Sequence, residues 1–461
     1  MKLLIYKPVL ILAAILIFSS CSKLTDVNNV EPVNQLSEDQ AITTVSQAQS
    51  ILYGAYGQVK TGLEVVAYNS GLTSLRGLTM VMGTSGSASI SEFENNDVSA
   101  ENFYVDVVYT KFYKIINNVN HIIEKAPLIN TQDPRRNQIV GEARFLRALS
   151  HFYLLRLHGY FFDLNSKYGI VIKDKPIAGA ISEPRATVQA TYDFIMADLD
   201  YAIANCPSFT NTFYASSQAA KALKAKVLLY EKKYSEAAIL AAEVIASGKF
   251  QLETTFLEIF TKKIINTKEV IFQTPYDDKN DRNNKAFIYR SSYLPSPYYI
   301  NLLTGDNRKP WAIVGTVAAP RNNKFNNTVF NGQSLTADTE YFLRLDEIYL
   351  ILAEAIARGN GPLTLTDAKN ALNSIRNRSQ MPNTTATTKA EVLEAIRIEK
   401  MLELGAENGE EWYDLVRYAT EGNLTVSTYK PGVTGVTKYV LPLPYLTVNL
   451  SNNVVEQNPG Y

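Results

Sequence analysis

Three histidines and several pairs of adjacent acids, such as Asp277–Asp278 and Glu410–Glu411, are the residues of this chain that could support catalysis or metal binding. His151 and His158 are seven residues apart and could share one face of a helix, but no acid or cysteine at ligand spacing completes a metal site with them or with His121. The paired acids Asp277–Asp278 and Glu410–Glu411 are sequence neighbours, which point apart in extended chain, whereas a glycosidase needs carboxylates that face each other. No phosphate-binding glycine loop and no nucleophile elbow is present. The sequence therefore predicts no catalytic residues, no metal and no cofactor.

Cys21 is the one residue for which the sequence predicts covalent chemistry. Lys2 and Lys7 precede an apolar run over residues 9–18, and Ser19 and Ser20 then lead directly to the cysteine. A charged start, a short apolar core and a small-residue exit are typical of a secretory signal. A cysteine at this position is where lipoprotein signal peptidases cleave and where diacylglycerol is attached. We expect residues 1–20 to be removed and Cys21 to carry a lipid anchor; the alternative is an ordinary secretory signal with an incidental cysteine.

The composition of the mature chain argues against several classes of protein. Without residues 1–20 it has 43 basic and 45 acidic residues, and no basic patch dominates, so nucleic-acid binding is not expected. No apolar run after the signal is long enough to span a bilayer. The only other cysteine, Cys206, lies in a helical pattern and is expected to be a small core residue.

Apolar residues recur at helical spacing through most of the chain, as at Val108, Phe112, Ile115, Val119 and Ile123. Prolines, glycines and capping residues punctuate these runs. The expected helices cover residues 40–60, 104–124, 134–157, 187–205, 216–232, 235–247, 338–358, 366–378, 391–404 and 411–418.

The helices at 216–232 and 235–247 also have the spacing of a tetratricopeptide repeat. Ala225 and Ala237 are twelve residues apart across a tight turn, which places small residues where two antiparallel helices touch. Ala355 and Ala368 repeat the pattern; a single such pair fits any antiparallel hairpin, but several favour a repeat. We expect a mostly α fold, a tetratricopeptide-like scaffold of about four helix pairs with minor β-structure such as 269–273. Residues 61–103, 249–336 and 424–461 are expected to be long, irregular loops that are nonetheless packed, because they are rich in aromatic residues.

Several motifs, in order along the chain, resemble the SusD/RagB family of nutrient-binding outer-membrane lipoproteins from Bacteroidota. They are Gly141-Glu-Ala-Arg-Phe-Leu-Arg-Ala148, Tyr192-Asp-Phe-Ile195, Val244-Ile-Ala-Ser-Gly248, Tyr341-Phe-Leu-Arg-Leu345, Leu372-Asn-Ser-Ile-Arg376 and the ending Gln457-Asn-Pro-Gly-Tyr461. Two positions depart from the family pattern: Lys400 and Glu411 stand where arginine is usual. The resemblance implies one SusD-like domain over residues 21–461, with an N-terminal part at 21–330 and a C-terminal part at 331–461.

The resemblance also implies a function. Such proteins capture oligosaccharide, or in some cases peptide or glycopeptide, outside the cell and act as a lid on a SusC-like, TonB-dependent transporter barrel. We therefore expect an outer-membrane, lipid-anchored protein that faces the exterior and is not an enzyme. Two alternatives stay open: a surface glycan-degrading enzyme, which a turnover assay would reveal, and a non-catalytic tetratricopeptide-type envelope scaffold.

Two segments correspond to the places where family members contact their ligands, residues 68–104 and 276–311. Aromatic rings offer flat apolar area to a sugar ring, while carboxamides and arginine orient its hydroxyl groups. The expected ligand-binding residues are Arg76, Asn95, Asn96, Tyr276, Tyr289, Tyr293, Tyr298 and Trp311. Trp412, the other tryptophan, lies in a helical pattern and is expected in the core. The insertion at Tyr160–Phe162 is a second place to look for ligand contacts.

Overall fold

The protein was analysed as a computed structural model that describes residues 42–177, 179, 182–261, 267–274, 284–316, 318–325 and 338–461. Residues 44–461 form one compact unit, and residues 1–43 are a separate unit. Cys21 and the expected signal at 1–20 lie outside the described residues. In the described part of the chain, no helix has both the length and the apolarity required to cross a membrane.

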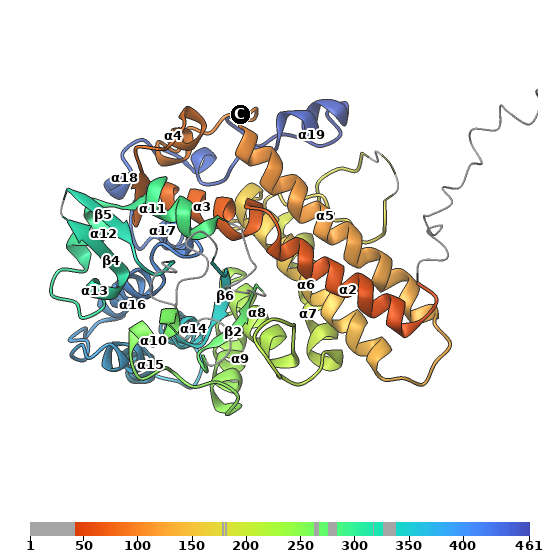
Figure 1. The fold of residues 1–461 in the computed structure, drawn as a ribbon. Coiled ribbons are helices and arrows are strands. Elements are labelled where there is room, and N and C mark those ends of the chain that lie inside the picture. The colour runs from red at the N-terminus through yellow and green to blue at the C-terminus, as the bar shows by residue number, and fades with distance from the viewer. Residues whose placement is uncertain are drawn as a thin grey trace, which may run out of the picture. The chain divides into compact units, whose positions relative to one another are not determined.

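Long helices account for most of the compact unit, as predicted (Figure 1). They are α2 (Val45–Lys60), α5 (Phe103–Lys125), α6 (Arg135–His158), α7 (Val188–Asn205), α8 (Ser217–Tyr230), α9 (Tyr234–Ala246), α14 (Leu345–Arg358), α15 (Leu365–Arg378), α16 (Lys389–Leu404) and α17 (Glu410–Thr420). Apart from the starts of α2 and α14, these bounds agree closely with the helices expected from periodicity. Several starts are fixed by side-chain caps, such as Thr187 on α7 and Ser216 on α8.

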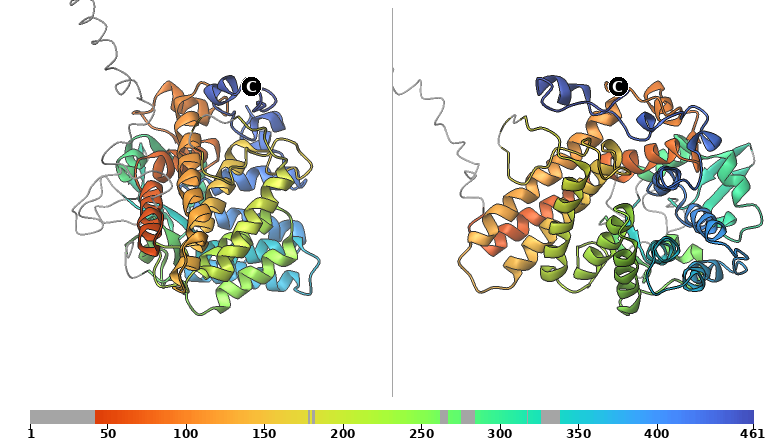
Figure 2. Two further views of the ribbon diagram at one scale, coloured as in Figure 1. Left: turned by 90° about the vertical axis from the view of Figure 1, so that its right-hand side faces the viewer. Right: turned by 180° about the vertical axis from the view of Figure 1, so that it is seen from behind.

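Helices that are consecutive in the chain pack against one another. Contacts run from α5 to α6, α7, α8 and α9 in turn, and α9 then packs against α14, which is followed by α15, α16 and α17. Figure 2 shows this succession of helices from two further directions. The mostly helical scaffold of paired helices is thereby confirmed. The packing of α9 on α14 joins the parts of the chain before and after residue 330.

The predicted small positions lie where α8 and α9 meet, since both Ala225 and Ala237 are fully buried. Replacing Ala237 by leucine should overpack this contact and lower the free energy of unfolding by about 1–3 kcal/mol, measured by chemical denaturation. Ala246→Leu, at an exposed position of the same helix, is the matched control. Equal stability of the two variants would contradict a tight contact at Ala237.

The expected start of the helix at residue 338 is wrong. Residues Tyr341–Arg344 form a strand, β6, which pairs antiparallel with β2 (Val270–Gln273), and α14 begins only at Leu345. All residues of both strands are buried, so the pairing satisfies backbone groups that no water can reach. The minor β-structure expected near 269–273 is confirmed as β2.

The segment 61–103, expected to be irregular, contains several short elements. A π-helical turn η3 (Glu64–Asn69) leads into α3 (Ser70–Arg76), followed by β1 (Met80–Met82) and α4 (Ala88–Glu94). All residues of α3 are buried, although three of the seven are serine or threonine. Such a helix has no polar face for periodicity to reveal; Thr73, for example, bonds its hydroxyl to the Asn69 carbonyl at 2.7 Å.

The C-terminal motif fastens three distant segments together. The Asn458 side-chain amide donates to the carbonyls of His158 and Leu441, both at 2.8 Å. Arg185 donates to the His158 carbonyl from the other side at 3.0 Å. The C-terminal motif that resembles the family thus has a structural role, because its hydrogen bonds hold the C-terminus of α6 in place.

Other short elements are η4 (Ala126–Leu128), α10 (Phe256–Thr261), η6 (Val436–Lys438) and α19 (Tyr445–Leu450).

Candidate functional site

The two segments expected to bind ligand lie side by side. Strand β1 pairs antiparallel with β3 (Tyr293–Pro295), in the register Met80↔Pro295 to Met82↔Tyr293. Around β3 stand the short helices α11 (Lys285–Ser291), α12 (Pro297–Leu302) and α13 (Lys309–Ala312) and the hairpin of β4 (Ile313–Thr316) with β5 (Ala319–Asn322). Figure 1 shows this group at the end of the compact unit away from α2 and α5.

Tyr289 and Tyr293 are buried inside this region. The Tyr289 hydroxyl donates to the Ser70 hydroxyl at 3.0 Å and lies 3.2 Å from the Glu407 carbonyl. The Tyr293 ring covers Gly71 so closely that a Cβ there would lie 2.2 Å from the ring. Burial raises the pKa of both phenols well above its ordinary value. We do not retain these two tyrosines as ligand contacts, because their rings hold α11 and β3 onto α3.

Arg76 and Asn96 are also interior residues. The Arg76 guanidinium lies 4.4 Å from the centre of the Trp412 ring, donates to the Asn96 side chain at 3.1 Å and to the Lys438 carbonyl at 2.6 Å. Burial lowers the pKa of Arg76 to about 10. Asn96 has a φ of 55°, a left-handed conformation that asparagine tolerates. Neither side chain is open to a ligand in this structure. Trp412 is fully buried, as predicted.

Of the other four expected ligand residues, three are exposed and one lies outside the described residues. Trp311 on α13 is 40% exposed and Tyr298 on α12 is 37% exposed, so part of each ring is accessible to a ligand. Asn95 is exposed at the end of α4. Tyr276 lies outside the described residues.

Tyr298 makes an edge-to-face contact with Tyr429, at 6.3 Å between ring centres, on the short helix α18 (Val426–Tyr429). Arg397 lies 5.0 Å from the Tyr429 ring centre and 3.3 Å from its hydroxyl, and Glu394 holds the guanidinium at 2.7 Å. Sequence reasoning missed Tyr429 because only the fold brings it to Tyr298. We use the name aromatic surface for the three rings of Tyr298, Tyr429 and Trp311, which lie on the separate short helices α12, α18 and α13.

Tyr298 and Tyr299, which are adjacent on α12, differ in exposure: Tyr299 is buried and Tyr298 is exposed. Ser296 caps this helix by accepting the Tyr299 amide at 3.0 Å, and Pro297 occupies its first turn. The Tyr299 ring is buried against Gly405, where a Cβ would lie 2.7 Å away. With Tyr299 anchored inward, its neighbour Tyr298 is directed to the solvent.

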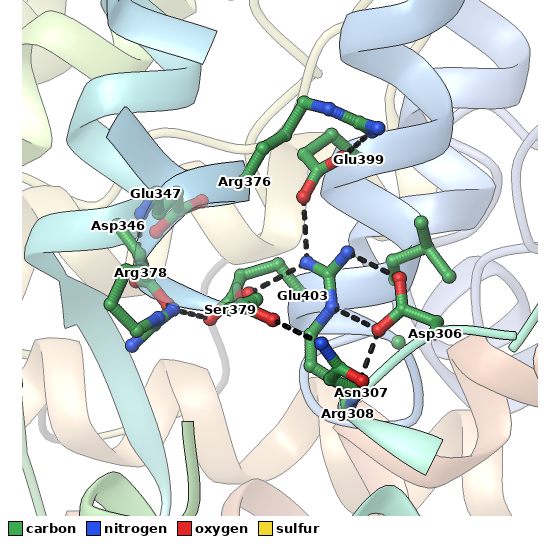
Figure 3. Close-up of polar contacts among 12 residues, drawn as sticks. Asp306, Asn307, Arg308, Asp346, Glu347, Arg376, Arg378, Ser379, Glu399 and Glu403 are labelled. Carbon is green, nitrogen blue, oxygen red and sulfur yellow. Dashed lines mark hydrogen bonds and ion pairs between the residues drawn. The ribbon is translucent and has the colours of Figure 1, made fainter. Parts of the chain in front are cut away.

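Trp311 is positioned by a buried arginine three residues before it. Arg308 is inaccessible to solvent; it forms a two-point contact with Asp306 at 2.7 and 2.9 Å and donates to Glu399 at 2.7 Å and Glu403 at 3.0 Å (Figure 3). The Trp311 amide in turn donates to the Arg308 carbonyl at 3.0 Å. The loop that carries Trp311 is therefore fixed to α16.

This ion network continues into the core. Arg376 donates to Glu399 at 2.8 Å, and Arg378 pairs with both Glu403 and Glu269 (Figure 3). Glu269, Glu403 and Asp346 approach one another closely enough to suggest a metal site. Arg344 pairs with Asp346 at 2.7 Å, however, so guanidinium groups already balance these charges and the donor set does not require an ion.

The groups considered for catalysis are engaged elsewhere. Glu410 pairs with Arg156 and Lys226, both at 2.7 Å, whereas Glu411 faces Thr79, so the two carboxylates do not face each other. Burial lowers the pKa of His151 and of His158 to about 3, and each ring bonds to a backbone carbonyl. Asp277 and Asp278 lie outside the described residues. The insertion residues Tyr160–Phe162 are buried and pack on the core.

Comparison with known proteins gives consistent matches along the chain. Residues 315–461 match the family model described as the SusD family, and residues 34–229 match the model described as starch-binding associating with outer membrane. SusD-like protein P38 of Formosa agariphila is 26% identical, with 98% of each chain covered. A SusD superfamily structure from Bacteroides thetaiotaomicron has a TM-score of 0.77 at 23% identity, covering 90% of this chain and 100% of that one. A laminarin-binding SusD-like structure has a TM-score of 0.75 at 23% identity, covering 90% and 99%.

Proposed function

We propose that this chain, which belongs to the SusD/RagB family, binds a neutral or weakly polar oligosaccharide at the aromatic surface and delivers it to a partner transporter. The observation that carries the proposal is the exposure of Trp311 and Tyr298 on short helices whose neighbours, Arg308 and Tyr299, are buried anchors. Rings fixed in this way bind a flat apolar ligand face with little loss of conformational entropy. Related proteins described as starch-binding or laminarin-binding support a glucan-like ligand.

The proposed affinity is modest. Each ring that stacks on a sugar contributes roughly 0.5–1.5 kcal/mol beyond its buried area. With a few such rings we expect a dissociation constant in the micromolar-to-millimolar range, which corresponds to a binding free energy of roughly 4–8 kcal/mol. Weak binding is sufficient for a receptor held beside its transporter, because tethering keeps the local concentration high. The near balance of acidic and basic residues in the mature chain provides no strong field for a polyanionic ligand.

The test is the double variant Trp311→Ala with Tyr298→Ala. Titration calorimetry with the best ligand from a glycan and peptide array should show affinity reduced by about 1–3 kcal/mol, roughly 5–150-fold, from the loss of two rings. The melting temperature should barely change, because both side chains are partly exposed. Tyr53→Ala, at an exposed tyrosine on α2, is the control. Full affinity in the double variant would place the site elsewhere, and an array that selects only peptides would overturn the oligosaccharide assignment.

We propose that the protein associates with the outer membrane through a lipid on Cys21, faces the exterior and docks on a SusC-like TonB-dependent transporter. The family description that mentions the outer membrane supports this location. Cys21→Ala should release the chain from membranes or leave it as precursor, as judged by fractionation and intact mass. Mild-detergent purification of the unaltered protein should recover a large β-barrel partner. Unchanged fractionation and mass of the variant would contradict the anchor, and recovery of the chain alone would contradict the partner.

A further inference from the structure

A second concave site lies far from the aromatic surface in sequence, between α5, the segment 171–177 and α19. Its cavity has a volume of about 470 Å³. This is within the range of pockets that enclose small ligands, about 300–1,000 Å³. Figures 1 and 2 both show α19 next to the N-terminal part of α5. None of the residues expected to bind ligand from the sequence lines this cavity.

One wall of the cavity is polar and comes from two helices. Thr110, Tyr113, Asn117 and Asn118 follow one another at helical spacing on α5, and Gln58 joins them from α2. The opposite wall, from α19 and the residues after it, presents Leu450, which is 75% exposed, and Val455 beside the hydroxyl-bearing Thr447 and Ser451. A cavity that offers carboxamides on one wall and aliphatic side chains on the other fits a ligand with both hydroxyl groups and an apolar face.

Part of the polar wall is already used to fix the cavity's shape. The Asn117 carboxamide accepts the Ile177 amide at 2.7 Å and donates to the Ile177 carbonyl at 3.3 Å. Tyr113 donates to the Val171 carbonyl at 2.7 Å, and Asn120, one turn further along α5, holds the carbonyls of Lys173 and Lys175. The segment 171–177 is therefore fastened to α5 along its length, and the cavity exists before any ligand arrives.

The remaining polar groups are open to a ligand. The side-chain oxygen of Gln58 is buried yet has no hydrogen-bond partner within the described structure. An acceptor in this state costs free energy that a donor from a ligand would recover. Asn118 lines the same wall and makes no hydrogen bond to the described residues. On the rim, Lys173 and Glu183 form an ion pair at 2.7 Å, and among the described lining residues only Lys114 carries a charge outside that pair, so no cluster of like charge is available for an anionic ligand.

We propose that this cavity binds a neutral saccharide unit, with the hydroxyl groups directed at Gln58 and Asn118 and the apolar ring face against the Leu450 wall. A hydrocarbon would leave the carboxamide groups without hydrogen bonds, and an ion would gain no free energy from contact with Leu450 and Val455. The proposal extends the proposed function, on which it rests for the class of ligand, by adding a second point of attachment. A glycan long enough to reach both sites would gain from their combined binding.

Hydrogen–deuterium exchange on the soluble mature chain tests the proposal, with laminarihexaose, maltohexaose and penta-alanine as separate probes. A glucan at a concentration of about ten times its dissociation constant occupies most of the cavities. Amide exchange that can occur only while the cavity is empty should then slow about tenfold in residues 108–118 and 445–455. Asn118→Leu should abolish this protection and leave that of residues 296–312 unchanged. Asn370→Leu, on the exposed face of α15, is the matched control and should lose neither.

The possible results separate the two sites. Protection at the cavity, with or without protection at residues 296–312, supports the second site; protection at the cavity alone would overturn the aromatic surface. Protection at residues 296–312 alone would overturn the second site and leave the proposed function standing. Protection of the cavity by penta-alanine alone would overturn the saccharide assignment. No protection by either glucan would overturn both assignments for neutral glucans.

Discussion

Replacing Arg308 by methionine is expected to lower the free energy of unfolding by about 3–5 kcal/mol, because removal of one partner leaves buried carboxylates uncompensated. Arg308 contacts Asp306, Glu399 and Glu403 and is inaccessible to solvent. Glu399 and Glu403 keep Arg376 and Arg378 as partners, whereas both Asp306 oxygens bond to Arg308. The uncompensated charge would therefore fall mainly on Asp306.

This assignment predicts a specific rescue. Adding Asp306→Asn to Arg308→Met removes the orphaned charge, so the double variant should be more stable than Arg308→Met alone. Lys309→Met, at the neighbouring and more accessible lysine, should change stability by no more than about 0.5 kcal/mol. Denaturant unfolding of the unaltered chain, these three variants and the single variant Asp306→Asn measures these differences. If Asp306→Asn destabilises the chain equally with and without Arg308, the charge argument fails.

The same variant links the core to the proposed ligand surface. The Arg308 carbonyl holds the Trp311 amide, so a loop that is no longer fixed to α16 should present Trp311 in many orientations. Glycan affinity should then fall even under conditions in which the variant is fully folded, because the ring must be ordered on binding. The Lys309→Met variant should bind the glycan with unchanged affinity. If Arg308→Met also binds with unchanged affinity, the ion network stabilises the fold without positioning Trp311.

Helices such as α5 could be predicted from sequence because they bury one side, and the apolar spacing indicates which side. Tyr298 and Tyr299 show where this information ends. In a helix of six residues, two adjacent tyrosines have the same local signal, and only the space above Gly405 decides which ring is buried. The sequence could therefore indicate this aromatic-rich segment as a candidate but could not distinguish its buried rings from its exposed ones.

Arg308 illustrates a second limit. In the sequence it stands among Asn307, Lys309 and Pro310, which is typical of an exposed loop. Its carboxylate partners on α16 follow 91 and 95 residues later, and nothing local indicates that pairing. Arg76, which was expected to meet ligand, is paired in the same nonlocal way with the Lys438 carbonyl. Charged residues inside a folded chain are identified by their partners, and those partners come from the tertiary fold.

Glu411 is a position where the chain departs from the family pattern by carrying an acid in place of arginine, and among the described residues this acid forms no ion pair within 4.0 Å. Its side chain is 5% exposed, lies against Gly77 and accepts a hydrogen bond from the Thr79 hydroxyl. Burial raises its pKa from 4.5 to about 7, and the Thr79 hydrogen bond offsets only part of that effect. The folded chain therefore holds this proton more tightly than the unfolded chain.

We expect Glu411→Gln to stabilise the protein in a pH-dependent way. Below pH 4.5 the acid is protonated in both states of the unaltered chain, so the two proteins should differ little. Between pH 4.5 and about 7 Glu411 ionises first in the unfolded state, so the unaltered chain loses a contribution to stability that the glutamine variant does not lose. The difference should reach a plateau above pH 7, at no more than about 3 kcal/mol for a shift of this size.

Unfolding free energies measured from pH 4.5 to 8 test this expectation. Glu142 and Glu340, whose pKa values burial also raises to about 7, are present in both proteins, so their contributions cancel in the difference. Glu411→Ala removes the charge together with the packing on Gly77, so its curve should run parallel to that of Glu411→Gln at lower stability. A constant offset between Glu411→Gln and the unaltered chain across this range would show that Glu411 finds a cation or water partner when ionised. In that case the acid would have replaced the arginine of the family pattern without a cost in stability at neutral pH.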